Sequence, residues 1–396
     1  MTKRLLSIAT LYPNPHQPRF GTFVARQLEA LAARPDWEVT VVNPIGLPPL
    51  PLGRYAPLAR VMGVEQRQRD LAVHRLPFML LPGIGGPINP AMIARAVLPL
   101  ARRLHAEAPF DLVDAQFFYP DGPAAARVAR ALGLPFAIKA RGADIHFWGA
   151  KSYARRQMLR AARDAAGLLA VSATLAGDMA ALGIARDRIE VHYTGLDREL
   201  FRPLDRRRSR EHIGRNFGIA LPASAPLLAT VGALIPRKGQ IHVLRALTLL
   251  PEAHLLLVGT GPDQTLLENF TRENGLADRV HFLGSVDHAL LPVALSAADA
   301  MVMPSSSEGL ANAWVEALAC GTPLVIADAG GARELLTRPE AGVIAAREGG
   351  AIAQAVEQLL ADPPEREAVA ACVAQFSWNA NATALQTHYN RWATTT

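Results

Sequence analysis

Short apolar runs alternate with helical patterns along most of this chain, and this alternation limits the possible folds more than any other feature. A short apolar run suits a strand buried on both faces, and a helical segment between two such runs suits a crossover between parallel strands. The strands predicted for the N-terminal half are Leu5–Thr10, Glu38–Val42, Leu112–Ala115, Pro135–Lys139, Leu168–Val171 and Ile189–His192. Those predicted for the C-terminal half are Leu227–Gly232, His254–Val258, Val280–Leu283, Ala300–Met303, Pro323–Ala327 and Gly342–Ile344. Each half holds enough strands for a doubly wound sheet, so we expect an α/β fold with two Rossmann-like domains facing one another across a cleft.

The length of 396 residues also favours two domains, because a single core rarely grows to that size. The arginine- and proline-rich stretch Phe201–Pro226 lacks strand character and is predicted to be the linker. We therefore expect one domain over residues 1–200 and another over 201–376. A last helix, predicted at about 377–396, carries Trp378 and Trp392 and is expected to cross back to the N-terminal domain.

Charge and cysteine content narrow the class of protein. The formal net charge is +6, but the chain has no zinc-finger spacing and no interleaving of aromatic and basic residues, so nucleic acid is not an expected partner. The two cysteines, Cys320 and Cys372, have neither metal-ligand spacing nor a disulfide framework. The N-terminus runs into a predicted strand without the apolar stretch of a signal peptide. These features predict a cytoplasmic enzyme.

Two segments raise the question of a membrane. Leu76–Ala94 is uncharged over about the length of a bilayer span, but its prolines and glycines exclude a regular spanning helix. It is predicted to be a loop packed on its own domain, with contact to lipid or to an apolar acceptor as the alternative. The arginine-rich segment from Lys151 to Arg163 is predicted to be a solvated helix face. Its alternative is docking to anionic lipid, which would place the protein peripherally at the inner face of a membrane.

Two glutamates, Glu308 and Glu316, stand eight positions apart where a predicted strand gives way to a predicted helix. The apolar run Ala298–Pro304 precedes them, and the stop signals Gly321 and Pro323 follow. Ligands bind at this edge of an open α/β sheet, and a helix N-terminus offers free N–H groups to anions. The segment is therefore a candidate site for phosphate and hydroxyl groups. Taken alone, each glutamate is equally compatible with a helix cap or a solvent-facing position.

The loop Val231–Gly239 follows another predicted strand. Its glycines, including Gly232, permit close backbone approach, and Arg237 and Lys238 supply two adjacent cations. A departing diphosphate needs such cations, because its developing charge must be neutralised. A basic surface turn is the alternative.

These segments resemble the family 4 retaining glycosyltransferases of the GT-B fold. The C-terminal motifs that carry the resemblance are Glu308–Pro323, Ala329–Gly331 with Glu334, Val231–Gly239, Leu257–Pro262 and Phe282–Val286. The looser N-terminal motifs are Tyr12-Pro13, Gly21–Phe23, Pro120–Gly122, Arg141–Asp144 and Ala170–Ser172. The resemblance implies a metal-independent hexosyltransferase that moves a sugar from a nucleoside-diphosphate sugar to a hydroxyl acceptor with retention. It also implies that the N-terminal domain binds the acceptor and the C-terminal domain the donor, in polysaccharide or lipid-linked glycan synthesis.

The same resemblance implies roles for individual residues. Lys238, with Arg237 as a second cation, matches the contact to the donor diphosphate, and Glu308 matches the contact to the transferred sugar. Glu316 matches the residue that holds the ribose. The remaining donor-binding positions are Gly21, Gly232, Val286, Gly309, Leu310, Ala311 and Asn312. Arg141 and Asp144 are expected on the acceptor side. No metal and no cofactor besides the nucleotide-sugar co-substrate is expected, in keeping with the lack of an Asp-x-Asp pattern.

Two departures from the family pattern qualify this interpretation. Ala233 stands where the family often has arginine, and we take Arg237 as a hypothetical replacement for that charge. Arg141 stands where many members have histidine, so no histidine role near the acceptor is expected. Two other functions remain open at this point. One is a sugar-nucleotide epimerase or hydrolase on the same fold, and the other is a non-catalytic subunit that binds nucleotide sugars.

Overall fold

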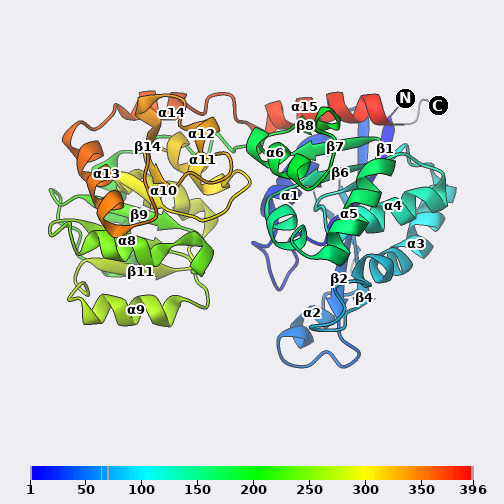
Figure 1. The fold of residues 1–396 in the computed structure, drawn as a ribbon, viewed down its shortest axis with the longest axis horizontal. Coiled ribbons are helices and arrows are strands. Elements are labelled where there is room, and N and C mark those ends of the chain that lie inside the picture. Colours follow the sequence, from blue (N-terminus) through cyan, green and yellow to red (C-terminus); the bar gives the residue numbers. More distant parts are fainter. Residues whose placement is uncertain (1, 64, 69–70, 394–396) are drawn as a thin grey trace. The chain divides into compact units, whose positions relative to one another are not determined.

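A computed structural model describes residues 2–63, 65–68 and 71–393, and the chain divides into two compact units. Unit 1 comprises Met1–Gly195 together with Trp378–Thr396, and unit 2 comprises Leu196–Ser377 (Figure 1). Each unit is built on its own sheet with helices packed against it, which is the two-domain α/β fold predicted from the alternation of apolar runs and helical segments.

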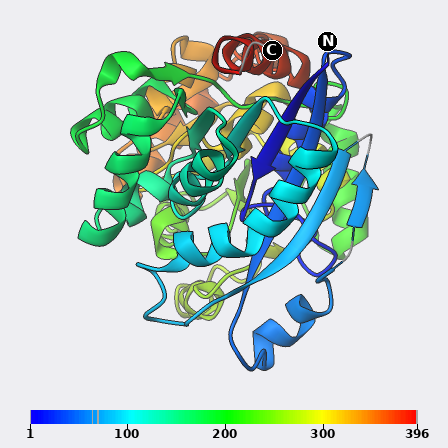
Figure 2. The ribbon, with the colours of Figure 1, turned by 90° about the vertical axis from the view of Figure 1, so that its right-hand side faces the viewer.

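The sheet of unit 1 has the strand order β3-β4-β2-β1-β5-β6-β7-β8, and every pair is parallel except β3 with β4. Its strands are β1 (Lys3–Ile8), β2 (Trp37–Leu47), β3 (Glu65–Gln68), β4 (Leu71–Met79), β5 (Leu112–Ala115), β6 (Phe136–Ala140), β7 (Gly167–Ala170) and β8 (Ile189–Val191). Its helices are α1 (Thr22–Ala32), α2 (Ala56–Ala59), α3 (Asn89–Glu107), α4 (Asp121–Leu132), α5 (Ser152–Asp164), α6 (Ala173–Ala181) and α15 (Trp378–Trp392), with short turns η1 (Gly53–Tyr55), η2 (Asp144–Trp148) and η3 (Arg186–Arg188). Figure 2 shows α3 lying across one face of this sheet.

The antiparallel strand β3 and the neighbouring β4 were not predicted, and the loop predicted for Leu76–Ala94 is wrong at both of its ends. Strand β4 continues to Met79, and α3 already begins at Asn89. Pairing with β2 extends from Ala72 to Met79, whereas β3 pairs only as far as His74. Pro77 therefore lies on the part of β4 that has one partner strand among the described residues, and a proline is tolerated there because no ladder N–H is missing.

Helix α15 packs in unit 1, which confirms the prediction that the last helix returns to the N-terminal domain. Its Leu385 and Tyr389 are buried in the same core as Leu28 of α1. The ring of Tyr389 lies edge-on to Trp37, with centroids 6.0 Å apart, and its hydroxyl donates to Asp114 Oδ2 at 2.5 Å. The helix thus contributes both apolar contacts and a buried hydrogen bond to unit 1.

The sheet of unit 2 has the order β11-β10-β9-β12-β13-β14 and is parallel throughout. Its strands are β9 (Leu227–Val231), β10 (His254–Val258), β11 (Val280–Gly284), β12 (Ala300–Met303), β13 (Leu324–Ile326) and β14 (Gly342–Ile344). Its helices are α7 (Arg206–Phe217), α8 (Gln240–Leu247), α9 (Gln264–Glu273), α10 (Leu291–Ala297), α11 (Asn312–Ala319), α12 (Ala332–Leu335), α13 (Gly349–Ala361) and α14 (Arg366–Ala371), with short turns η4 (Pro236–Lys238), η5 (His288–Leu290) and η6 (Pro339–Ala341). The chain proceeds from β9 outward to β11 and then returns to β12 on the other side of β9. The order of strands therefore reverses between β9 and β12, where α/β sheets usually bind ligands.

The stretch predicted to be a linker is instead an ordered part of unit 2. Helix α7 occupies the middle of it, and Asp205 caps the helix by accepting a hydrogen bond from the Arg208 N–H. The guanidinium groups of Arg206 and Arg210 lie 2.8 and 2.6 Å from the carboxylate of Asp299. Two of the arginines in this stretch therefore form ion pairs within unit 2, which a solvated linker would not provide.

Among the helices of the described residues, none combines the length and the apolar character needed to span a bilayer.

Candidate functional site

The loops that follow β9 and β12 meet at the switch point of unit 2. The loop after β9 ends in the turn η4 and in Gly239, whose φ of 75° opens α8. A Cβ at Gly239 would lie 2.6 Å from the Pro304 carbonyl oxygen, so only glycine lets the two loops approach this closely. The Ser306 N–H donates to the Arg237 carbonyl at 2.8 Å, and Arg347 Nε donates to the Pro304 carbonyl at 2.7 Å. The two loops are thereby fixed to each other.

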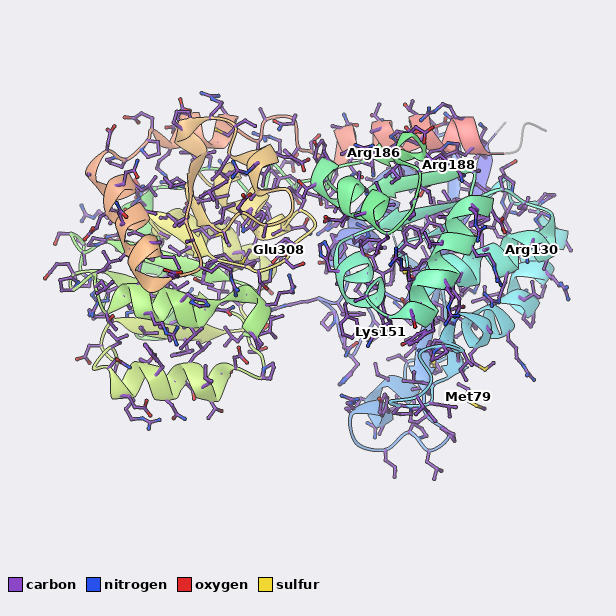
Figure 3. All side chains as sticks on the ribbon, in the orientation of Figure 1. Met79, Arg130, Lys151, Arg186, Arg188 and Glu308 are labelled. Atoms are coloured by element: carbon purple, nitrogen blue, oxygen red, sulfur yellow. The ribbon has the colours of Figure 1, made fainter. Side chains whose placement is uncertain are left out.

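Two cations converge on one buried carboxylate at this junction. Lys238 Nζ lies 2.6 Å and an Arg237 guanidinium nitrogen 2.9 Å from Glu308 Oε1. Glu308 is only 8% exposed, and Figure 3 marks its position in unit 2. Burial alone would raise the pKa of Glu308, but the adjacent Lys238 and Arg237 hold it below its usual value. We call these three side chains the ion cluster. With two cations and one carboxylate, it retains one positive charge to offer an anion.

The backbone after Glu308 is held against the loop that follows β13. The Gly331 N–H donates to the Gly309 carbonyl at 2.8 Å. Gly330 has a φ of 53°, and a Cβ there would lie 2.3 Å from the Glu308 carbonyl oxygen. Helix α11 then begins at Asn312, and the helix geometry leaves the N–H groups of Asn312 and Ala313 without acceptors within the helix, whereas the Trp314 N–H donates to the Ala311 carbonyl at 3.1 Å. The start of α11 thus brings amide donors next to the ion cluster.

Glu316 lies on α11, and among the described residues its carboxylate has neither an ion pair nor a hydrogen bond. Burial raises the pKa of Glu316 to about 7. The side chain is largely but not fully shielded from solvent. A shielded carboxylate without a protein donor is costly to keep charged, so the position suits a ligand that brings its own hydroxyl donors.

Val286 lies two strands away from the ion cluster within unit 2, and Gly21 belongs to the other unit. Val286 is buried just after β11, the edge strand, which is separated from β9 by β10. Gly21 belongs to unit 1, where its φ is 72° and where a Cβ would lie 2.5 Å from the Leu11 carbonyl oxygen. This close backbone approach requires glycine whatever the function of the loop. Donor contacts by either residue remain predictions.

In unit 1, Asp144 organises the loop after β6. Its carboxylate accepts hydrogen bonds from the N–H groups of Phe118 at 2.7 Å, Gly142 at 2.8 Å and Arg141 at 3.0 Å. Burial raises the pKa of Asp144 even though these N–H groups and the charge of Arg141 favour the ionised form. A carboxylate engaged by so many main-chain donors acts on its surroundings mainly by positioning Arg141.

Arg141 is held in place by neutral groups. Its Nε donates to the Gln116 carbonyl at 2.8 Å, a second guanidinium nitrogen donates to Gln116 Oε1 at 2.5 Å, and the guanidinium lies 5.0 Å from the centre of the Phe23 ring. Among the described residues it forms no ion pair with a carboxylate. Burial lowers the pKa of Arg141 to about 10. At neutral pH it therefore remains a cation that can receive an anionic group.

Beneath Arg141 lies a buried polar network that the sequence did not single out. Lys139 Nζ lies 2.7 Å from Gln27 Oε1 and 2.5 Å from His192 Nδ1, and the Gln27 amide donates to Gln116 Oε1 at 3.0 Å. Burial lowers the pKa of Lys139 well below its usual value. The chain contains only four lysines, and this scarcity is a signal that could have singled out Lys139.

Comparison with known families covers most of the chain. The model described as "Glycosyltransferase Family 4" matches residues 20–200, and the model described as "Glycosyl transferases group 1" matches residues 216–372. The chain is 36% identical over 217 residues to a D-inositol 3-phosphate glycosyltransferase of Mycobacterium leprae, a match that covers 52% of this chain and 49% of that protein. A protein of the same name from Mycobacterium tuberculosis matches equally, over 44% of its length. The chain thus spans about half the length of these curated relatives.

Solved structures show the same fold over the whole chain. Sucrose-phosphate synthase from Thermosynechococcus elongatus matches with a TM-score of 0.79 and 22% identity, covering 98% of both chains. Anabaena HepE, in complex with UDP and glucose, matches with a TM-score of 0.72 and 21% identity, covering 98% of this chain and 100% of that one. The catalytic domain of starch synthase IV from Arabidopsis thaliana, bound to ADP and acarbose, matches with a TM-score of 0.73 and 15% identity, covering 99% of both chains.

Proposed function

The chain belongs to the family 4 glycosyltransferases of the GT-B fold, and from this premise we propose that it transfers a sugar from a nucleoside-diphosphate donor to a hydroxyl acceptor with retention of configuration. The observation that carries the proposal is the ion cluster at the switch point of unit 2. It combines a surplus positive charge, free amide donors at the start of α11 and a shielded carboxylate on that helix. The positive charge suits a diphosphate, the amide donors suit the oxygens of a phosphate or sugar, and the carboxylate suits the hydroxyls of a ribose.

A nucleotide-sugar donor is the ligand that fits this arrangement. The diphosphate would bind Lys238, Arg237 and the amides that begin at Gly309, and the ribose diol would donate to the unpartnered Glu316. Structural relatives in complex with UDP, UDP-glucose and ADP support a nucleotide-sugar donor. Unit 2 is therefore proposed as the donor-binding part of the chain and unit 1 as the acceptor-binding part.

The proposed reaction needs no protein nucleophile. The bond between the anomeric carbon and the diphosphate oxygen breaks, and the acceptor oxygen forms its new bond on the same face of the sugar. The acceptor proton passes to the departing diphosphate. Lys238 and Arg237 stabilise the charge that develops on this leaving group. Glu308 orients Lys238 and accepts a hydrogen bond from a sugar hydroxyl. Because these cations supply the charge, we propose that turnover needs no metal and persists in a chelator.

Arg141 indicates the character of the acceptor. It lies beyond the carboxyl end of β6 and is held by neutral partners, so its charge is available to a substrate. We propose that the acceptor is a glycan or lipid-linked glycan with an anionic group that Arg141 receives. The inositol phosphate named for the mycobacterial relatives is consistent with an anionic acceptor.

The proposal is tested by a thermal-shift screen of nucleoside-diphosphate sugars, followed by assays of nucleoside-diphosphate release with a panel of anionic glycan acceptors. We expect one donor to raise the unfolding temperature, and its diphosphate to be released only when an acceptor is present. Release without acceptor would instead indicate a hydrolase or epimerase. Donor binding without product over the panel would favour a non-catalytic subunit.

Replacing Arg237 with alanine tests whether this residue supplies the charge that Ala233 cannot. We expect turnover to fall about 10- to 100-fold, less than for loss of Lys238, because Arg237 is more exposed and shares Glu308 with it. Steady-state kinetics with saturating donor measure the effect, and the exposed Arg215 on α7 provides a control alanine variant. Near-normal turnover in the Arg237 variant would show that the diphosphate site works with one cation.

A further inference from the structure

We propose that unit 1 docks on an anionic membrane through a surface formed by α5, its two flanking elements and the apolar loops beside it. This docking surface contains the basic residues Arg127, Arg130, Lys151, Arg155, Arg156, Arg160, Arg163, Arg186 and Arg188. It also contains the exposed apolar residues Leu50, Leu52, Met79, Ile84, Ile88 and Phe147. The inference concerns a lipid partner and does not depend on the proposed transfer reaction.

The basic part of this surface carries far more positive than negative charge. The exposed carboxylates on α4, α5 and η3 are Asp164 and Asp187, which stand against nine basic side chains. Only one of these arginines has an acidic partner among the described residues, since Arg130 lies 2.9 Å from Asp164. A surface whose charges are predominantly positive attracts a polyanionic partner over about a Debye length.

Other arginines of this surface donate hydrogen bonds to main-chain carbonyls rather than to carboxylates. Arg155 donates to the Leu182 carbonyl at 2.9 Å, and Arg188 donates to the Ala162 carbonyl at 2.9 Å. Arg156 and Arg163 have weaker contacts of 3.3 and 3.4 Å with carbonyls one turn earlier in their own helix. Their charges are therefore not neutralised within the protein and can bind phosphates.

Hollows of headgroup size lie on both sides of α5. One, of about 120 Å³, lies between α4 and α5 and is lined by Arg127, Arg130 and Arg160 together with Asp164, the partner of Arg130. The other, of about 430 Å³, is lined by Arg163 and Arg188 between α5 and the segment that leads to η3. Both hollows can admit a lipid phosphate between arginine side chains.

The apolar part of the surface comes from two loops that leave neighbouring strands. Leu47 at the end of β2 pairs with Met79 at the end of β4, and the loops that follow carry Leu50 and Ile84, each 76% exposed. Aliphatic side chains held this far into solvent cost free energy unless another apolar phase receives them.

The loop of Ile84 is attached directly to the basic part. Gln157 Nε2 of α5 donates to the Pro87 carbonyl at 2.9 Å, and the Tyr119 hydroxyl, just before α4, donates to the Gly86 carbonyl at 2.6 Å. In the view of Figure 3, Met79 lies toward one end of unit 1 and Arg186 and Arg188 toward the other, with Lys151 between them. The apolar loop of Ile84 therefore borders the basic helix α5.

A bilayer fits this combination better than a soluble polyanion does. Arginines beside exposed aliphatic chains match a membrane interface, where phosphates lie above an acyl phase. A single-stranded nucleic acid would use aromatic stacking platforms, and of the apolar residues on this surface only Phe147 is aromatic. A duplex, which binds through its phosphates, would leave the exposed aliphatic side chains in water. The ring of Phe147 is already covered by Lys151, whose Nζ lies 4.6 Å from its centre.

Flotation with vesicles tests the proposal on the full chain. We expect the protein to float with phosphatidylcholine vesicles that contain about 30 mol % phosphatidylglycerol, to be released by high salt, and not to float with phosphatidylcholine alone. The triple variant Arg156→Glu, Arg160→Glu, Arg163→Glu should bind at least about 100-fold more weakly, at about fivefold per lost cation. The variant Leu50→Gln, Ile84→Gln should bind several-fold more weakly with an unchanged salt dependence.

Matched variants in unit 2 separate this surface from net charge and general hydrophobicity. Arg208→Glu, Arg215→Glu, Arg272→Glu changes the net charge equally at exposed positions, and Leu249→Gln, Leu266→Gln removes two exposed aliphatic side chains elsewhere on the protein. Both should float like the wild type, and unfolding temperatures confirm that every variant is folded. Loss of flotation in the charge control, equal binding to uncharged vesicles, or retention on heparin without flotation would overturn the proposal.

Discussion

Replacing Lys238 with alanine lowers turnover by about 10²–10³-fold, the usual effect of removing one group that stabilises developing charge. The ammonium is shielded from solvent and lies 2.6 Å from Glu308, so the site holds it where a leaving diphosphate would gain charge. The protein should remain folded, because Arg237 still neutralises the Glu308 carboxylate at 2.9 Å. Single-turnover rates with saturating donor measure the chemical step, and the unfolding temperature reports the fold.

The variant Lys238→Met sharpens this experiment, because it keeps most of the side-chain volume next to Met303 and removes only the charge. Equal losses in the alanine and methionine variants would attribute the effect to charge. Arg215→Ala on the exposed face of α7 serves as the control for general loss of a cation in unit 2. Turnover of a folded Lys238 variant within a few-fold of the wild type would exclude this lysine from catalysis.

Much of the fold could be predicted because its strands are short, apolar and buried. The ends of β5, β10, β12 and β14 match the predicted bounds, since each is a short run in which apolar residues dominate. Strand β4 was missed for the opposite reason. It contains His74 and Arg75, both buried, and the pairing with β2 that makes it a strand joins residues far apart in the chain.

Arginine composition misled the prediction for the segment Phe201–Pro226. A run of arginines is usually solvated, but Arg210 is buried and bonds to the carbonyls of Ala223 and Ala297 as well as to Asp299. These acceptors lie up to 89 residues away, so no local pattern indicates them. The helix follows from tertiary contacts that composition does not reveal.

The residues of the candidate site were proposed from sequence motifs, and their geometry could not be predicted. The motifs place Lys238 and Glu308 at neighbouring strand ends, and the structure brings them into one ion cluster. Glu308 was expected to face a sugar, yet in the structure it also neutralises Lys238. The network of Gln27, Gln116 and Lys139 could not be predicted, because its hydrogen bonds join residues 89 and 112 positions apart that match no motif.

Replacing Glu316 with glutamine should weaken nucleotide binding while making the free protein more stable at alkaline pH. The folded pKa of Glu316 is about 7, above its ordinary value of 4.5, because burial disfavours the charge. Between these two values the folded state binds more protons than the unfolded state, so the contribution of Glu316 to stability is present below pH 4.5 and is lost as the pH rises through 7. At pH 8 the variant avoids that loss, and its free energy of unfolding should be about 1–3 kcal/mol higher.

The affinity for the donor should rise with pH, whereas the contribution of Glu316 to stability falls. Ribose hydroxyls donate to the ionised carboxylate, so the affinity of the wild type for the nucleoside-diphosphate sugar, whose diphosphate does not titrate in this range, should fall about tenfold for each pH unit below 7. Calorimetric titrations between pH 5.5 and 8 measure this slope, which should disappear in Glu316→Gln, whereas the exposed Glu357→Gln on α13 should retain it. A wild-type affinity that stays flat over this range would show that Glu316 does not hold the ribose. If the variant is stabilised at pH 8 while the wild-type affinity is flat, the carboxylate is shielded for a purpose other than nucleotide binding.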